Sequence, residues 1–109
     1  VGVPLHGAPE AQYIVLTQKN NSWQIEPHYI PYDYQSALNE FVLSGMLSRG
    51  GPIAWLLYIE IKTGSRQLSK FLEDAKQKSL KDFDADTLKT KITKYLIKFG
   101  YWEEIKVKL

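Results

Sequence analysis

Residues 11–33 constrain the fold of this 109-residue chain more than any other stretch. Two apolar runs, at residues 13–16 and 23–30, lie on either side of a polar break. This is the pattern of two antiparallel strands joined by a tight turn, with Asn20 and Asn21 as turn residues. The sequence therefore predicts a β-hairpin near its start.

The first strand, residues 12–17, is apolar on both faces. Tyr13 and Val15 point to one face, and Ile14 and Leu16 point to the other. A strand of this kind needs a cover on both sides, and the helices expected later in the chain could supply one cover at best. We therefore expect this chain, which does not begin with methionine, to be a piece of a longer protein that carries the second cover.

The second strand, residues 23–29, contains a proline. Pro27 cannot donate a ladder hydrogen bond, so we expect an edge strand or a bulge. His28 is expected to face solvent on that edge. We assign no metal to it, because no Asp, Glu or His lies at metal-ligand spacing.

The rest of the chain is expected to be helical. Asp33 is suited to cap the first helix, and Asp84 or Asp86 to cap the last long one. From residue 52 onward the helices are expected to form an antiparallel cap with short connections. Apolar residues recur at helical spacing and predict helices at residues 33–48, 53–62, 65–79 and 84–99, with a short turn within residues 101–109.

The segment 53–62 fits two structures. Leu57 and Ile59 belong to an alternating pattern typical of a strand, yet the apolar spacing fits a helix almost as well. Pro52 before the segment and Gly64 after it favour a helix that ends in a glycine cap. We therefore predict a helix here.

A chain of 109 residues is long enough for one small domain. Because 44% of its residues are apolar, that domain can bury a core. It contains no cysteine, so it has neither a disulfide framework nor a thiolate metal site. That composition fits a reducing compartment. No apolar run approaches the roughly 20 residues that span a bilayer. We expect a cytoplasmic protein without a membrane partner.

Charge is distributed unevenly along the chain. Residues 1–60 hold 2 basic and 5 acidic side chains, a net charge of −3, whereas residues 61–109 hold 12 basic and 7 acidic ones, a net charge of +5. A basic helical half could bind nucleic acid or an acidic protein. The lysines alternate with Asp and Glu, however, which favours an ordinary solvated helix face. A small basic binding module is therefore the alternative function.

A Glu-x-Lys motif at Glu60 and Lys62 suggests a third function. On a strand, a carboxylate could hold a divalent cation while the ammonium orients water, as in restriction-endonuclease-like nucleases. That site also needs an upstream acid on a paired strand, but Glu40 lies in a predicted helix and Asp33 at a helix cap. The metal-dependent nuclease is the less favoured alternative. No phosphate loop or serine elbow is present, and we name no catalytic or metal-binding residue.

The first 33 residues resemble the C-terminal strands of calcineurin-like metallophosphoesterases, in the bacterial phosphodiesterase-type branch. The resemblance rests on an ordered set of short motifs, with Pro27 as the one departure from the usual pattern. The matching motifs are Val1-Gly2-Val3-Pro4, Gly7, Ala11-Gln12-Tyr13-Ile14-Val15-Leu16 and Pro31-Tyr32-Asp33.

The resemblance implies an α/β fold, with this piece itself α+β. Residues 1–33 would form the loop and β-hairpin of a four-layer sandwich. Residues 34–109 would form a helical cap, and this part of the chain resembles the family more loosely. It also implies a hydrolase with two divalent metal ions of the Mn, Fe or Zn class, held by Asp, His and Asn, whose bridging hydroxide attacks phosphorus.

The same resemblance implies that all metal ligands lie upstream of Val1. This chain would then bind no metal and be inactive alone, with the missing N-terminal part of the enzyme as its partner and a phosphoester as the substrate. The segment that follows the last ligand loop would lie near the metal centre, which makes Val1, Gly2, Pro4 and His6 the candidate substrate-adjacent residues. From the residues alone, His6 reads as a loop hydrogen-bonding group.

Overall fold

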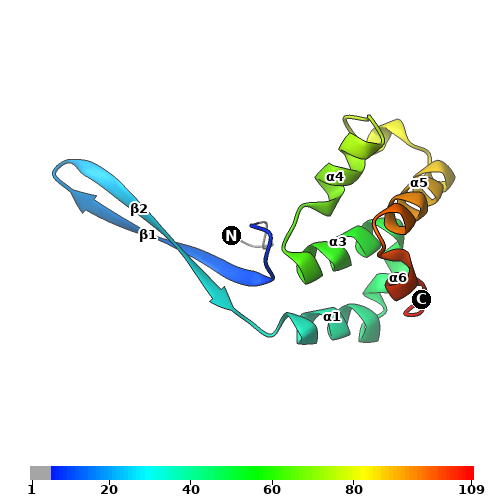
Figure 1. The fold of residues 1–109 in the computed structure, drawn as a ribbon, viewed down its shortest axis with the longest axis horizontal. Coiled ribbons are helices and arrows are strands. Elements are labelled where there is room, and N and C mark those ends of the chain that lie inside the picture. The colour runs from blue at the N-terminus through cyan, green and yellow to red at the C-terminus, as the bar shows by residue number, and fades with distance from the viewer. Residues whose placement is uncertain (1–5) are drawn as a thin grey trace.

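The computed structural model, which describes residues 6–109, is a mixed α+β structure in which a two-stranded antiparallel hairpin precedes the helices (Figure 1). Strand β1 is Glu10–Lys19 and strand β2 is Ser22–Pro31. Ten residues of each strand pair in one unbroken register. The predicted hairpin is confirmed, and both strands are longer than the sequence pattern indicated.

The turn of the hairpin has the predicted residues. Asn20 and Asn21 have φ values of 51° and 63°, which are the two positive values of a type I′ turn. This turn suits the right-handed twist of the strands. Pro27 pairs directly with Ile14, so the bulge considered for the second strand is absent.

Helices account for most of the remaining residues. The predicted caps are present: an Asp33 carboxylate oxygen accepts the Ser36 N–H at 3.1 Å, and Asp84, not Asp86, accepts the Thr87 N–H at 2.8 Å. Within residues 6–109, no helix is both long and apolar enough to cross a bilayer. The helices are α1 Tyr34–Leu43, α2 Met46–Arg49, α3 Gly51–Thr63, α4 Gln67–Asp74, the 3-10 helix η1 Leu80–Asp82, α5 Ala85–Lys98 and α6 Trp102–Lys106.

Two predicted helices are wrong in extent. The single helix expected at residues 33–48 is broken between α1 and α2, because Gly45 takes a left-handed conformation with φ of 78°. The Ser44 hydroxyl donates to the Glu40 carbonyl at 2.6 Å and so helps to end α1. The helix expected at residues 65–79 ends at Asp74, since Lys76 has φ of 56°.

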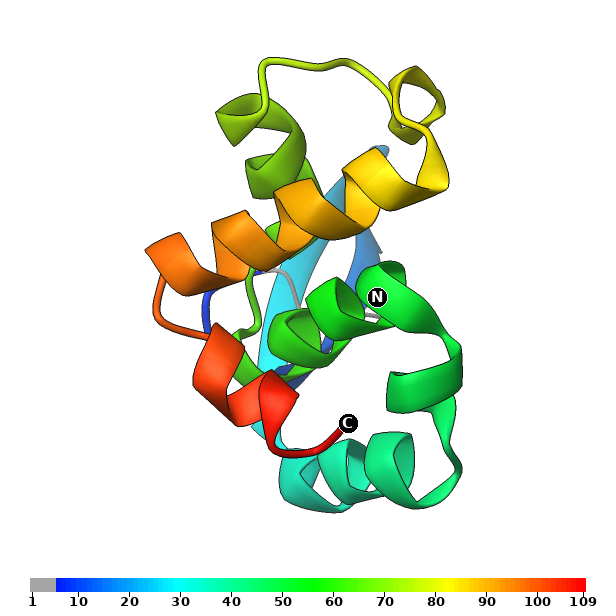
Figure 2. The same cartoon turned by 90° about the vertical axis from the view of Figure 1, so that its right-hand side faces the viewer.

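Helix α3 confirms the choice of helix over strand for residues 53–62. Pro52 lies in its first turn, and Gly64 closes it with φ of 68°. In both views α3 lies between α1 and α5 (Figure 1, Figure 2). Its buried residues are Ala54, Trp55, Leu56, Tyr58, Ile59 and Glu60.

Within residues 6–109, the hydrophobic core lies in the helical part of the chain. The hairpin contributes no residue to it and extends away from the helices (Figure 1). The radius of gyration is 16.8 Å, compared with about 13 Å for a compact chain of this length. We expected the helices to cover one face of the first strand at best, and they cover neither. The core residues are Leu38, Leu47, Trp55, Leu56, Tyr58, Ile59, Phe71, Ile92, Tyr95, Leu96 and Ile105.

This division predicts a sharp contrast between two isoleucines. Ile59 is fully buried, whereas Ile25 in the hairpin is 67% exposed. Ile59→Ala should lower the free energy of unfolding by about 2–5 kcal/mol because it leaves a cavity. Ile25→Ala, the matched control, should change it by about 0.5 kcal/mol or less. Urea denaturation monitored by circular dichroism measures both, and equal losses would contradict a core confined to the helices.

Candidate functional site

Of the four candidate substrate-adjacent residues, only His6 lies within the described residues; Val1, Gly2 and Pro4 lie outside them. The His6 side chain is 19% exposed at the base of the hairpin. Its ring centre is 4.4 Å from that of Tyr29, and its Nε2 atom is 3.4 Å from Glu10 Oε1. His6 therefore makes the local contacts of a loop histidine, and its place beside a substrate stays a prediction.

The segment after His6 is fastened to the helices. The Gly7 N–H donates to the carbonyl of Gly64 at 2.7 Å. A Cβ atom on Gly64 would lie 2.1 Å from the Ala8 carbonyl oxygen, so the two backbones touch. This contact holds residues 6–8 between the hairpin base and the junction of α3 and α4.

The hairpin presents two faces of different composition. The apolar face carries Ile14, Leu16, Trp23, Ile25 and Tyr29, of which Trp23 is 63% exposed. Isolated exposed apolar side chains are ordinary on protein surfaces, whereas a contiguous group of this kind marks an interaction surface. The apolar face is therefore a candidate docking surface.

The mixed face carries Tyr13, Val15, Gln24, Glu26 and His28. The rings of Tyr13 and His28 stack with centres 4.8 Å apart and planes 8° apart. His28 Nε2 lies 3.3 Å from Glu26 Oε1. His28 thus faces outward, as predicted, although the Tyr13 ring partly covers it.

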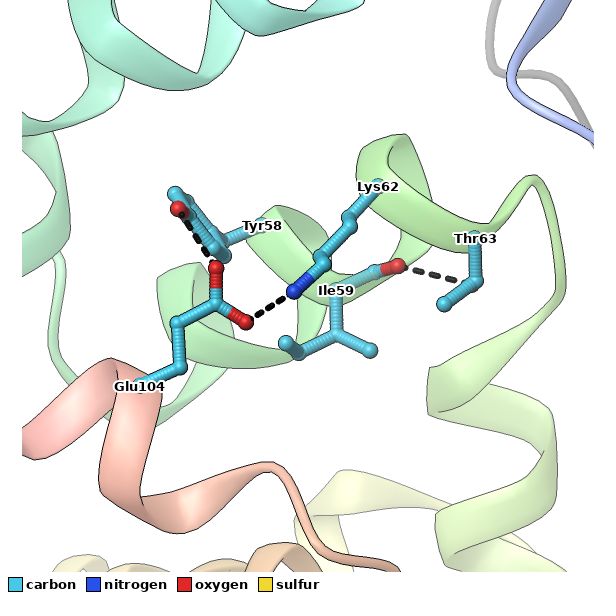
Figure 3. A network of polar contacts seen from close by, with 5 residues as sticks. All are labelled: Tyr58, Ile59, Lys62, Thr63 and Glu104. Carbon is cyan, nitrogen blue, oxygen red and sulfur yellow. Dashed lines mark hydrogen bonds and ion pairs between the residues drawn. The ribbon is translucent and has the colours of Figure 1, made fainter.

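The Glu-x-Lys pair lies on helix α3, not on a strand, and its two side chains have separate partners. Glu60 is 7% exposed, and its carboxylate accepts the Leu68 N–H at the start of α4 at 3.0 Å. Lys62 forms an ion pair with Glu104 of α6 (Figure 3). The strand that the nuclease motif requires is absent here.

Glu104 ties α6 to α3 by a second contact. The Tyr58 hydroxyl donates to Glu104 Oε1 at 3.3 Å (Figure 3). Burial, together with the neighbouring Glu104 charge, raises the pKa of Tyr58 to about 12. Tyr58 therefore stays protonated near neutral pH and acts as a hydrogen-bond donor, which gives the network a structural role.

An open cleft of about 460 Å³ lies beside α4 and α5. The Tyr95 hydroxyl donates to Gln67 Oε1 at 2.9 Å, and Gln67 Nε2 donates to Ser65 at 2.9 Å. Burial, with lesser effects from Tyr101, Asp74 and Glu60, raises the pKa of Tyr95 to about 12. The polar groups at the cleft floor satisfy one another. Its lining residues are Gln67, Lys70, Glu73, Asp74, Tyr95, Phe99 and Tyr101.

No signal in the sequence indicated which groups meet at these places. Tyr29 is 23 positions from its partner His6, and Glu104 is 42 positions from Lys62; no local pattern connects either pair. Across residues 6–109, no three His, Cys, Asp or Glu side chains gather where they could hold a metal ion. We therefore assign no metal ligand to these residues.

The contact between Gly64 and Ala8 predicts a specific loss of stability. Gly64→Ala should destabilise the protein by about 1–2 kcal/mol through its left-handed conformation, and further because the new methyl group collides with Ala8. Gly100 also follows a helix at positive φ, but a Cβ there would meet nothing within 4 Å. Gly100→Ala is thus the matched control. Thermal or urea denaturation measures both, and a loss no larger for Gly64→Ala than for Gly100→Ala would contradict the contact.

The comparisons with known proteins identify no relative. No protein-family model, curated protein or solved structure matches the chain.

Proposed function

We propose that this chain is the C-terminal part of a metal-dependent phosphoesterase of the calcineurin-like class. The hairpin completes the β-sandwich of that enzyme, and residues 34–109 form a helical cap beside it. The role of the chain is structural within the enzyme, and its substrate-adjacent part is the segment that contains His6.

The observation that carries the proposal is the uncovered hairpin. Both of its faces hold exposed apolar side chains, with Leu16 at 54% on one face and Tyr13 at 44% on the other. The helices already have a complete core of their own. A four-layer sandwich is an architecture that covers both faces of such strands.

The position of the cap agrees with this proposal. In the enzymes that the chain resembles, the segment that corresponds to its first residues follows the last metal-binding loop. The bond from Gly7 to Gly64 fixes the following segment against the end of α3. The helical cap would therefore lie near the entrance to the metal centre and could limit access of substrate.

The proposal assigns the metal chemistry to a part of the enzyme other than these residues. In the proposed enzyme, two divalent ions would supply a nucleophilic hydroxide and balance charge on the phosphoryl oxygens. His6 and Glu10 contact each other but make no set of three ligands. We derive no catalytic step for this chain, which instead positions the loop and completes the sheet.

The proposal predicts a difference between this chain and the natural protein that contains it. Purified residues 1–109 should hydrolyse no bis(p-nitrophenyl) phosphate even with added manganese, whereas the natural protein should hydrolyse it with metal. Turnover by residues 1–109 would contradict the proposal, and so would an inactive natural protein.

Within the natural protein, His6→Ala should lower kcat/KM by roughly 10- to 100-fold through a displaced loop, and His28→Ala is the matched control.

A second candidate function is binding of nucleic acid by α5. Lys91, Lys94 and Lys98 share one face of this helix and line a hollow of about 180 Å³. Lys98 pairs with Asp74 at 2.5 Å, whereas no ion pair within residues 6–109 involves Lys91 or Lys94. Free lysines on one face are the arrangement that contacts phosphates.

This candidate is tested by salt-dependent binding. A labelled DNA duplex should bind at low salt, with log K falling against log salt with a slope no steeper than about −1.8 for the two phosphate contacts of Lys91 and Lys94. The double variant Lys91→Ala/Lys94→Ala should lose the binding. Lys89→Ala, on the opposite side of α5, is the control. Fluorescence anisotropy that detects no binding at low salt would remove this function.

A further inference from the structure

The surface of the molecule is larger than its mass requires. The accessible surface is 7393 Å², whereas a compact protein of 12.6 kDa exposes about 6,200 Å². The excess of about 1,200 Å² exceeds the roughly 800 Å² that each partner contributes to a standard interface. The hairpin extends away from the helices and contributes to this excess (Figure 1).

The two open edges of the hairpin differ in their hydrogen-bonding groups. In an antiparallel ladder, residue pairs alternate between those that bond each other and those whose N–H and C=O groups point outward. A two-residue turn makes the flanking pair, Lys19 and Ser22, a bonded one. Counting from there, the outward residues are Gln18, Leu16, Ile14, Gln12 and Glu10 on β1, and Trp23, Ile25, Pro27, Tyr29 and Pro31 on β2.

Two observations agree with this count. Pro27 pairs with Ile14 in an unbroken register, which is expected only where no ladder N–H is needed. The Glu10 N–H, which the count directs outward, donates to the Ala8 carbonyl at 2.8 Å instead of to β2. The outward groups of each strand are therefore assigned consistently.

Strand β2 has the features of a blocked edge. Pro27 and Pro31 remove two of its five outward N–H groups, and Glu26 adds a charge to the strand. Prolines and charged side chains are the means by which natural edge strands avoid pairing with another strand. Strand β2 is therefore a poor template for a further strand.

Strand β1 has the opposite character. It carries no proline, and its two charged residues, Glu10 and Lys19, lie at its ends, so the eight residues between them are uncharged. Four of its five outward residues, Gln12, Ile14, Leu16 and Gln18, keep an N–H group to donate, while Glu10 already donates to Ala8. An open, apolar edge of this length is a ready template for β-augmentation.

We propose that β1 is the strand through which the hairpin joins a larger sheet, and that its occupant is an extended apolar strand from the body of the proposed phosphoesterase. This inference rests on the proposed function and goes further, because it names the joining edge. Pairing of two β1 strands from two copies would leave both hairpin faces uncovered, whereas a strand within a sandwich comes with layers that cover them.

Residue-resolved amide hydrogen exchange by NMR tests the joining edge. In residues 1–109 alone, the outward amides of β1 and β2 should both exchange rapidly. In the natural protein, the amides of Gln12, Ile14, Leu16 and Gln18 should exchange at least roughly 100-fold more slowly. Those of Trp23 and Ile25 should stay fast.

Two matched proline variants sharpen the test, because Leu16 and Ile25 are cross-strand partners at outward positions. Leu16→Pro removes one outward N–H from β1, and Ile25→Pro removes one from β2, without loss of a ladder bond in either case. In the natural protein, Leu16→Pro should abolish the protection of Ile14 and Gln18. Ile25→Pro, like native Pro27, should leave it intact.

Several outcomes would overturn this inference. Protection of the outward amides of β2 instead of β1, or of neither, would reject the edge assignment while leaving metal-dependent hydrolysis unaffected. Protection of β1 in residues 1–109 that rises with protein concentration would make a second copy the occupant. Protection of β1 in a natural protein that lacks all phosphoester hydrolysis would instead reject the proposed function and leave the edge assignment standing.

Discussion

Burial of helix α3 is the constraint on which the helical part of the structure depends. Its side chains pack against neighbours on several sides, so its polar groups need partners inside the protein. The Trp55 indole N–H donates to the Leu47 carbonyl at 3.1 Å, and Glu60 accepts the Leu68 N–H. These bonds connect α3 to α2 and α4, and Glu104 connects it to α6. The helices thus satisfy one another without help from the hairpin.

The hairpin, unlike the helices, is held together by its backbone hydrogen bonds and not by a buried core. Its two-residue turn and complete backbone ladder settle its local geometry, but no layer of the described structure covers its side chains. Two-stranded sheets of this kind are marginal unless another layer packs on them. The sandwich that we propose would supply that layer. The contact of residues 7 and 8 with Gly64 joins the segment before the hairpin to the end of α3.

The elements with strong local signals were predictable from the sequence. Two asparagines between apolar runs indicated the turn, and Pro52 with Gly64 indicated a helix where periodicity was ambiguous. The break at Gly45 was missed because its apolar neighbours keep a nearly helical spacing through residue 47. The candidate site was less accessible to sequence reasoning. The partners of His6 and Glu104 are distant in sequence, and three candidate residues lie outside the described part of the chain.

The sequence by itself indicated the order of strands and helices, though not every boundary, because turn residues, caps and apolar periodicity act over a few positions. It also indicated that the first strand is apolar on both faces. Only the tertiary structure decided that α3 would be the buried centre and that the hairpin would stand outside the core. Burial depends on which segments meet in space. Glu60 is buried among the helices and Trp23 is exposed, and the residues that decide this are related by no local sequence pattern.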